Sequence, residues 1–211
     1  MLRKIINSKR LVVLFALVIV SSIILISLIA LSHKEKVFTG KNTPAGSKAS
    51  EDPLSPNYKW KGDKKDPKKI IIKKINVNAY VEKVGLDKNQ EVGSPKSIYL
   101  AGWYKGSVRP GQKGLSVIDG HVAGKKNNGV FRNLEKLNVG DEYTVVFGDN
   151  SSKKFKITGK ISVPVEDAVS AIFSQTPKII EQLNLVTCDG KFNSKTQSYP
   201  QRLVIISTLK Q

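Results

Sequence analysis

Three side chains in the second half of the sequence have the chemistry needed for acyl transfer. Cys188 is the only cysteine in the chain, and His121 is the only histidine besides His33. A thiol is a strong nucleophile as a thiolate, and a neighbouring cationic group lowers its pKa. An imidazole can pass a proton to a leaving amine, and the planar guanidinium of Arg202 can bind a carbonyl oxygen and the oxyanion that develops from it. These types point to a cysteine nucleophile (Cys188), a general acid and base (His121) and an oxyanion stabiliser (Arg202).

Composition alone does not bring the three residues together. The alternative is a buried core cysteine, a histidine in a loop and an arginine on the surface. A single cysteine excludes a disulfide within the chain. One histidine and one cysteine supply too few ligands for a usual zinc site, so we expect no metal and no other cofactor.

Each of the three residues stands at the end of an apolar, strand-like stretch. His121 and Cys188 close such stretches and Arg202 opens one, and strand ends present side chains at the rim of a rigid scaffold. β-branched and aromatic residues separated by turn signals predict seven or eight strands, within residues 70–72, 75–81, 97–100, 115–121, 142–147, 154–163, 183–188 and 202–208. Short helices are expected within residues 130–137 and 168–183. The pattern predicts an all-β barrel or sandwich.

The N-terminal region contains an uncharged apolar stretch at residues 11–31. As a helix it would span roughly 32 Å, enough to cross a bilayer core of about 30 Å. Basic residues within the first ten positions precede it, and such flanks stay in the cytoplasm. A cleaved signal peptide is the alternative, but its apolar part is usually about 7–15 residues long. We expect a cytoplasmic N-terminus (residues 1–10), a single transmembrane anchor at the cell membrane and an extracytoplasmic remainder.

Residues 32–69 are rich in Lys, Asp, Pro, Gly and Ser and are predicted to be a flexible linker, because they bury too little apolar surface to offset chain entropy. Residues 70–211 are predicted to be the folded domain. The formal net charge of the chain is +18, which suits a position near anionic lipid or anionic wall polymer. The predicted topology removes the domain from nucleic acid. A Lys-rich solvated surface explains the same charge.

Several segments of residues 70–210 resemble the sortases, especially the compact group called class F, with relatives in classes E and D. The resemblance is carried in order by Val84-Gly85-Leu86, Ala101-Gly102-Trp103-Tyr104, Arg109-Pro110-Gly111-Gln112-Lys113-Gly114, Ser116-Val117-Ile118-Asp119-Gly120-His121-Val122, Val130-Phe131-Arg132-Asn133-Leu134, Val139-Gly140-Asp141, Leu183-Asn184-Leu185-Val186-Thr187-Cys188-Asp189-Gly190 and Arg202-Leu203-Val204. The order and spacing of these blocks together make the likeness specific.

The resemblance implies a closed, eight-stranded sortase-type β-barrel with its site at the mouth of a groove. It implies that Cys188 attacks the Thr carbonyl of an LPxTG-like sorting signal on a secreted protein and forms a thioacyl enzyme. An amine of a cell-wall (peptidoglycan) precursor or a pilin Lys would then resolve it. Thr187 and residues 165–183 would border the substrate.

Some positions depart from the family pattern. Asp119 replaces a small residue and, in a regular strand, shares a face with His121; it could contact the imidazole or substrate, or point to solvent. Arg202 is placed slightly differently from some relatives, which leaves Arg109 and Arg132 as alternative arginines.

Two other functions compete with this interpretation. An L,D-transpeptidase would place its cysteine in a Ser-x-Gly-Cys context, whereas this chain has Val186-Thr187-Cys188. A non-catalytic basic module that binds anionic cell-wall polymers would leave Cys188 and His121 dispensable, and its binding would weaken steeply with salt.

Overall fold

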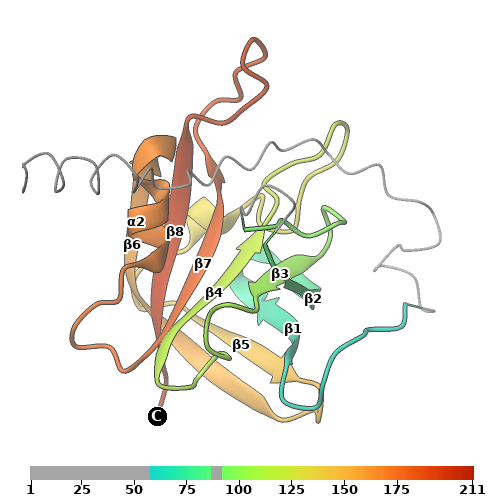
Figure 1. The fold of residues 1–211 in the computed structure, drawn as a ribbon, viewed down its shortest axis with the longest axis vertical. Helices are drawn as coiled ribbons and strands as arrows, with labels where there is room; N and C mark the ends of the chain where they lie inside the picture. The colour runs from blue at the N-terminus through green and yellow to red at the C-terminus, as the bar shows by residue number, and fades with distance from the viewer. Residues whose placement is uncertain (1–57, 87–91) are drawn as a thin grey trace, which may run out of the picture. The chain divides into compact units, whose positions relative to one another are not determined.

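A computed structural model describes residues 58–86 and 92–211. The strands are β1 (Pro67–Ile72), β2 (Val77–Val84), β3 (Ala101–Tyr104), β4 (Gly114–Gly120), β5 (Glu142–Phe147), β6 (Ser152–Pro164), β7 (Glu181–Asp189) and β8 (Gln201–Leu209). They close into a barrel in the order β1-β2-β3-β4-β7-β8-β6-β5 (Figure 1). The pairs β2–β3 and β4–β7 are parallel, and the other six are antiparallel. The expected eight-stranded barrel is confirmed.

One expected strand is wrong. Residues 97–100 form a turn, in which the amide of Leu100 donates to Ser97 O, and the strand β3 begins immediately after it. The helices are short: α2 (Ala168–Phe173) and the 3₁₀ turns η2 (Lys73–Ile75), η3 (Leu134–Lys136) and η4 (Val165–Asp167). The helix expected within residues 130–137 is therefore reduced to one 3₁₀ turn.

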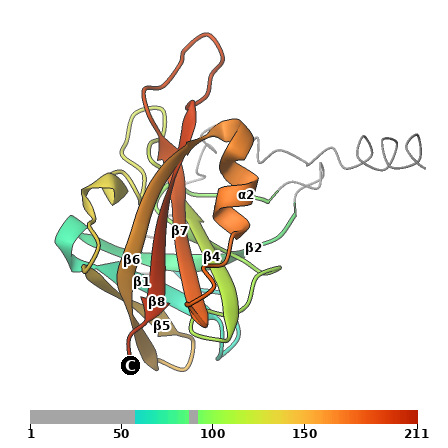
Figure 2. The ribbon, with the colours of Figure 1, turned by 90° about the vertical axis from the view of Figure 1, so that its left-hand side faces the viewer.

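Side chains of the strands alternate between two apolar clusters. The barrel interior is filled by residues such as Ile118, Leu185 and Ile205. Their neighbours Val186 and Val204 point outward instead and pack with Ala168 and Ile172 in a second cluster. Helix α2 thus covers part of the outer face of β4, β7 and β8 (Figure 2). Because successive residues of a strand face opposite ways, this cluster marks the outer face of these three strands.

The folded domain begins earlier than the predicted linker boundary at residue 69. Strand β1 already starts at Pro67, and Trp60 donates its indole N–H to Val81 O over 2.7 Å. Residues 58–66 therefore belong to the barrel and not to a linker. The local composition concealed this because the contacts that order the segment come from residues about twenty positions away.

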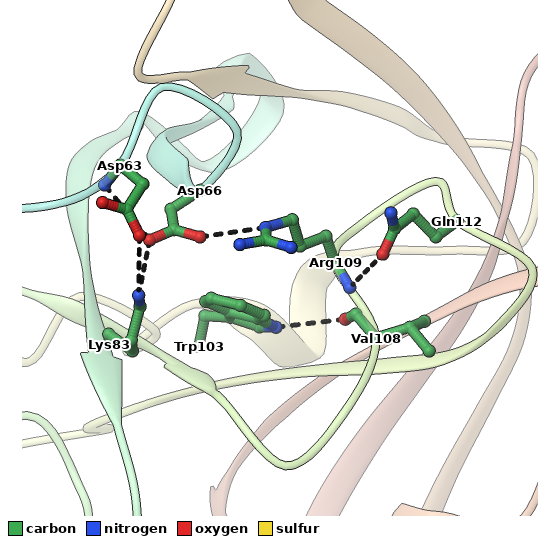
Figure 3. Close-up of polar contacts among 7 residues, drawn as sticks. All are labelled: Asp63, Asp66, Lys83, Trp103, Val108, Arg109 and Gln112. Carbon is green, nitrogen blue, oxygen red and sulfur yellow. Dashed lines mark hydrogen bonds and ion pairs between the residues drawn. The ribbon is translucent and has the colours of Figure 1, made fainter.

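A buried carboxylate fixes this first segment to the barrel (Figure 3). Asp66 is 2% exposed, and its two oxygens lie 2.7 Å from Lys83 Nζ and 3.0 Å from Arg109 Nε. Both cations also lie over the ring of Trp103. The pKa of Asp66 is lowered: burial alone would raise it, but hydrogen bonds from Lys83, the Asp63 amide and Arg109 outweigh burial.

No helix among residues 58–86 and 92–211 is both long and apolar enough to cross a membrane. The predicted anchor at residues 11–31 lies outside the described residues.

Candidate active site

Three adjacent strands bring the predicted site residues into one row. The parallel strands β4 and β7 pair Asp119 with Val186, and two residues further along both chains come His121 and Cys188. The antiparallel strands β7 and β8 then pair Cys188 with Arg202. Figure 1 shows β4, β7 and β8 side by side. Since neighbouring strands lie about 4.8 Å apart, Cys188 stands between the histidine and the arginine.

Two of the three side chains, those of Cys188 and Arg202, also share a face. Cys188 and Arg202 lie two residues from Val186 and Val204, which belong to the outer apolar cluster beneath α2. The period of two along a strand therefore turns both side chains to the same outer face. His121 lies one residue past the end of β4, which is the strand on the opposite side of β7 from β8.

Cys188 is half-buried near the end of β7. Its neighbour Thr187 is buried, and the Thr187 hydroxyl donates to Gly120 O over 2.7 Å. This bond ties β7 to the last residue of β4, directly beside His121. The structure gives Thr187 a contact within the fold, and the substrate contact expected for it stays a prediction.

His121 is 8% exposed, and its Nε2 lies 2.9 Å from the carbonyl oxygen of Pro95. Removal from water lowers the pKa of His121, and the hydrogen bond to Pro95 offsets this only in part. Burial of a charge in a low dielectric is unfavourable, so the surroundings of His121 favour the neutral imidazole over the imidazolium.

Arg202 is 3% exposed, and its Nη1 donates to Gln201 O at 2.9 Å and to Tyr199 O at 3.2 Å. Its Nε is buried and has no hydrogen-bond partner among the described residues. A buried donor without a partner costs free energy unless an acceptor arrives. The guanidinium is thus held by the backbone at one nitrogen and has a donor left for another oxygen.

The two alternative arginines are placed differently. Arg109 is bonded to Asp66 and lies over the ring of Trp103, which belongs to the cluster inside the barrel, whereas Cys188 and Arg202 share the outer face. Arg132 is exposed, but its charge reaches Tyr199, whose pKa is raised by burial and by Cys188 and lowered by Arg132. Arg109 is therefore remote from the row, whereas Arg132 is in its neighbourhood.

Asp119 does not point to solvent, which was one of its two expected placements. It is 8% exposed, and Ser94 lies close to it. Burial raises its pKa well above the usual value, against opposing hydrogen bonds and together with the charge of Glu82. The imidazole's hydrogen bond goes to Pro95 instead. Sequence reasoning missed Pro95, for which the only signal was the turn-forming run Gly93-Ser94-Pro95.

Within the part of the chain that the structure describes, no three His, Cys, Asp or Glu side chains gather as a metal site.

Comparison with known proteins identifies the family. The sequence model of the sortase domain family matches residues 70–210 of this chain. Among solved structures, the fold is similar to a lid mutant of sortase A from Corynebacterium diphtheriae (19% identity, TM-score 0.55, covering 72% of this chain and 73% of that one). It is also similar to a sortase D5 transpeptidase from Clostridium perfringens (23% identity, TM-score 0.51, covering 68% of this chain and 78% of that one). A third similar structure is sortase C from Streptococcus pneumoniae (16% identity, TM-score 0.52, covering 71% of this chain and 71% of that one). No curated protein matches.

The closed eight-stranded barrel and the match to the sortase domain together indicate a protein of the cysteine transpeptidase class. The chain belongs to the sortase family.

Proposed function

We propose that this protein is a membrane-anchored sortase that cleaves an LPxTG-like sorting signal through Cys188 and transfers the cleaved protein to an amine. The observation that carries the proposal is the adjacency of β4, β7 and β8: Cys188 pairs with Arg202, and His121, one residue past the end of β4, follows at the same level as Cys188 in an alignment continued from the Asp119–Val186 pair. A non-catalytic polymer-binding module would have no need for this alignment.

The first half-reaction forms a thioester. His121 takes the thiol proton of Cys188, and the sulfur attacks the Thr carbonyl carbon of the signal. The carbonyl oxygen becomes an oxyanion, which the unpartnered Nε–H of Arg202 stabilises. The C–N bond to Gly then breaks, and the imidazolium gives its proton to the departing amine.

The second half-reaction restores the enzyme. An acceptor amine, from a peptidoglycan precursor or a pilin Lys, attacks the thioester carbon and loses a proton to the imidazole. The C–S bond breaks, and the thiolate recovers its proton from His121. The similar sortase C of Streptococcus pneumoniae is described in terms of pilin substrate specificity, and a pilin is therefore one kind of partner that we include in the proposal.

The cellular location in this proposal is inferred from the sequence. Residues 11–31 would anchor the chain in the cell membrane, with the N-terminus inside and the barrel outside, where newly exported proteins pass. The chain's charge of +18 favours the anionic surroundings of that surface.

The test uses the full chain in mild detergent with a quenched LPxTG peptide and an added amine. We expect slow cleavage, faster with the amine, and a thioacyl adduct detected by intact mass. Cys188→Ala should abolish both. Because Cys188 is the only cysteine, no other thiol can replace it, so cleavage by Cys188→Ala at the wild-type rate would refute the mechanism.

A further inference from the structure

The hydrogen bond between His121 and Pro95 has a defined direction. A proline carbonyl accepts hydrogen bonds and cannot donate, so Nε2, at 2.9 Å, must carry the hydrogen. In the neutral imidazole the other nitrogen, Nδ1, then has the lone pair. Because the ring is 8% exposed, water competes little for either nitrogen.

Pro95 packs against a row of paired residues on the three neighbouring strands β2, β3 and β4. The registers pair Glu82 with Gly102 and Gly102 with Asp119, so the two carboxyl groups flank a position that has no side chain. A Cβ on Gly102 would lie 2.9 Å from Pro95 Cγ and 2.6 Å from Asp119 Oδ1. The proline ring and the Asp119 carboxyl therefore occupy the space that any other residue at position 102 would need.

The two carboxyl groups also lie next to the residues on either side of Pro95. Glu82 Oε1 accepts the Lys96 amide over 2.6 Å, and the Asp119 carboxyl lies close to Ser94 and to the site beside Gly102 that the Pro95 ring also borders. Residues 94–96 are thus bounded by both carboxyl groups, and the carbonyl oxygen of Pro95 lies 2.9 Å from the imidazole.

We propose that Pro95 O holds His121 as its Nε2–H tautomer, so that Nδ1 exchanges protons with Cys188 and with the amines, and that Glu82 and Asp119 are positioning residues acting through residues 94–96. The catalytic consequence rests on the proposed function, whereas the tautomer and its support do not.

The chemistry of the support fits a neutral resting imidazole. The orienting group is an uncharged carbonyl, which fixes the ring but stabilises the imidazolium less than an aspartate would. The charged groups facing this region are Glu82, which accepts the Lys96 amide, and Asp119, whose burial raises its pKa well above the usual value. The same burial disfavours a negative charge on Asp119, two residues from His121.

The first test reads the tautomer without substrate. Nitrogen-15 labelling of histidine in the full chain, with His33→Gln to remove the second signal, gives two-bond nitrogen–hydrogen correlations whose pattern separates the tautomers. We expect the Nε2–H pattern for His121 at pH values above its pKa. An Nδ1–H pattern, or equal exchange between the two, would overturn the proposal.

The second test perturbs the support with matched variants. Glu82→Ala removes the acceptor of the Lys96 amide, and Glu82→Gln keeps one. Gly102→Ala displaces Pro95, whereas a Cβ at Gly159, another strand glycine, meets only ordinary contacts at 3.4 Å and beyond. We expect Glu82→Ala and Gly102→Ala to mix the tautomers and to lower kcat about tenfold to a hundredfold with a smaller change in KM. Glu82→Gln and Gly159→Ala should keep the wild-type pattern.

If folded Glu82→Ala keeps the wild-type tautomer and the wild-type kcat, the positioning role of Glu82 is refuted. This variant also provides the decisive result if Gly102→Ala does not fold. The outcomes also separate the two proposals. A wild-type chain that fails to cleave the LPxTG peptide refutes the proposed function, while the tautomer measurement still stands or falls on its own spectrum.

Discussion

Replacing Asp119 with asparagine tests whether its carboxyl is buried as a neutral acid. The side chain is 8% exposed, and Oδ1 has no hydrogen-bond partner among the described residues. Burial, with a further contribution from the charge of Glu82, raises its pKa well above the usual 3.8. Asparagine has nearly the same shape and never ionises, so it removes the unfavourable charge and keeps the packing.

The sign of the effect follows from the proton balance. Between pH 3.8, where the unfolded carboxyl titrates, and the higher pKa of the folded state, the folded chain binds one proton more than the unfolded chain. The free energy of unfolding therefore falls as pH rises, by about 1.4 kcal/mol per pH unit for one proton. This contribution is fully present below pH 3.8 and is lost as pH rises through the folded pKa. Asp119→Asn has no such loss.

The assay is urea unfolding of the full chain in detergent at several pH values from 4.5 to 8. The advantage of Asp119→Asn over the wild type should grow with pH at up to the slope above. The quantity compared is the difference between the unfolding free energies of Asp119→Asn and the wild type. This difference cancels the effect of His121: burial lowers its pKa, so both proteins lose stability as pH falls below 6.5. A difference independent of pH, or one that shrinks as pH rises, would refute the neutral acid.

Asp141→Asn provides a control of opposite sign. Asp141 lies 2.7 Å from Lys74 Nζ, and that hydrogen bond, with one from the Asn138 amide, lowers its pKa. Its stabilisation is present above pH 3.8 and is lost as pH falls through the folded value, so the Asp141→Asn and wild-type curves should run parallel across the assay range.

Two further predictions concern the row and the first segment. Arg202→Lys should lose most of the cleavage activity, since a point charge cannot replace the planar guanidinium held by two carbonyl oxygens. The control, Arg109→Lys, should keep the wild-type kcat. Equal activity of Arg202→Lys and the wild type would assign oxyanion stabilisation to another group. Asp66→Asn should lower the free energy of unfolding by about 1–3 kcal/mol, because a buried carboxylate with two cationic partners loses its charge. Its urea midpoint should fall while kcat is retained, and an unchanged midpoint would contradict this role.

The strand positions were largely readable from the sequence because alternation of apolar residues is a local signal. Residues 142–147 match β5, and the other strands that were found differ mainly at their ends. Residues 97–100 misled because an apolar run such as Ile98 to Leu100 fits a buried turn as well as a strand. The real strand, β3, contains Gly102, which lowers strand propensity. That glycine is required by Pro95 and Asp119, which fill the place of its Cβ.

The start of the domain could not be read locally. Residues 58–66 have the composition of a linker, yet Trp60 and Asp66 are tied to Val81, Lys83 and Arg109. Such contacts join positions about twenty or forty residues apart, and composition carries no information about them.

The sequence by itself determined which chemistry was available: one thiol, one histidine in the folded domain, and strand ends to carry them. Only the tertiary structure decided how they are arranged. The parallel pairing of β4 with β7 and the antiparallel pairing of β7 with β8 place His121, Cys188 and Arg202 in one row. The β2–β3 and β3–β4 pairings place the buried Asp119 beside Gly102 and the Pro95 ring, and the Pro95 carbonyl oxygen lies 2.9 Å from the imidazole. Register between strands more than sixty residues apart is set by the closure of the whole barrel, because each strand must satisfy both neighbours at once, and no local pattern records that condition.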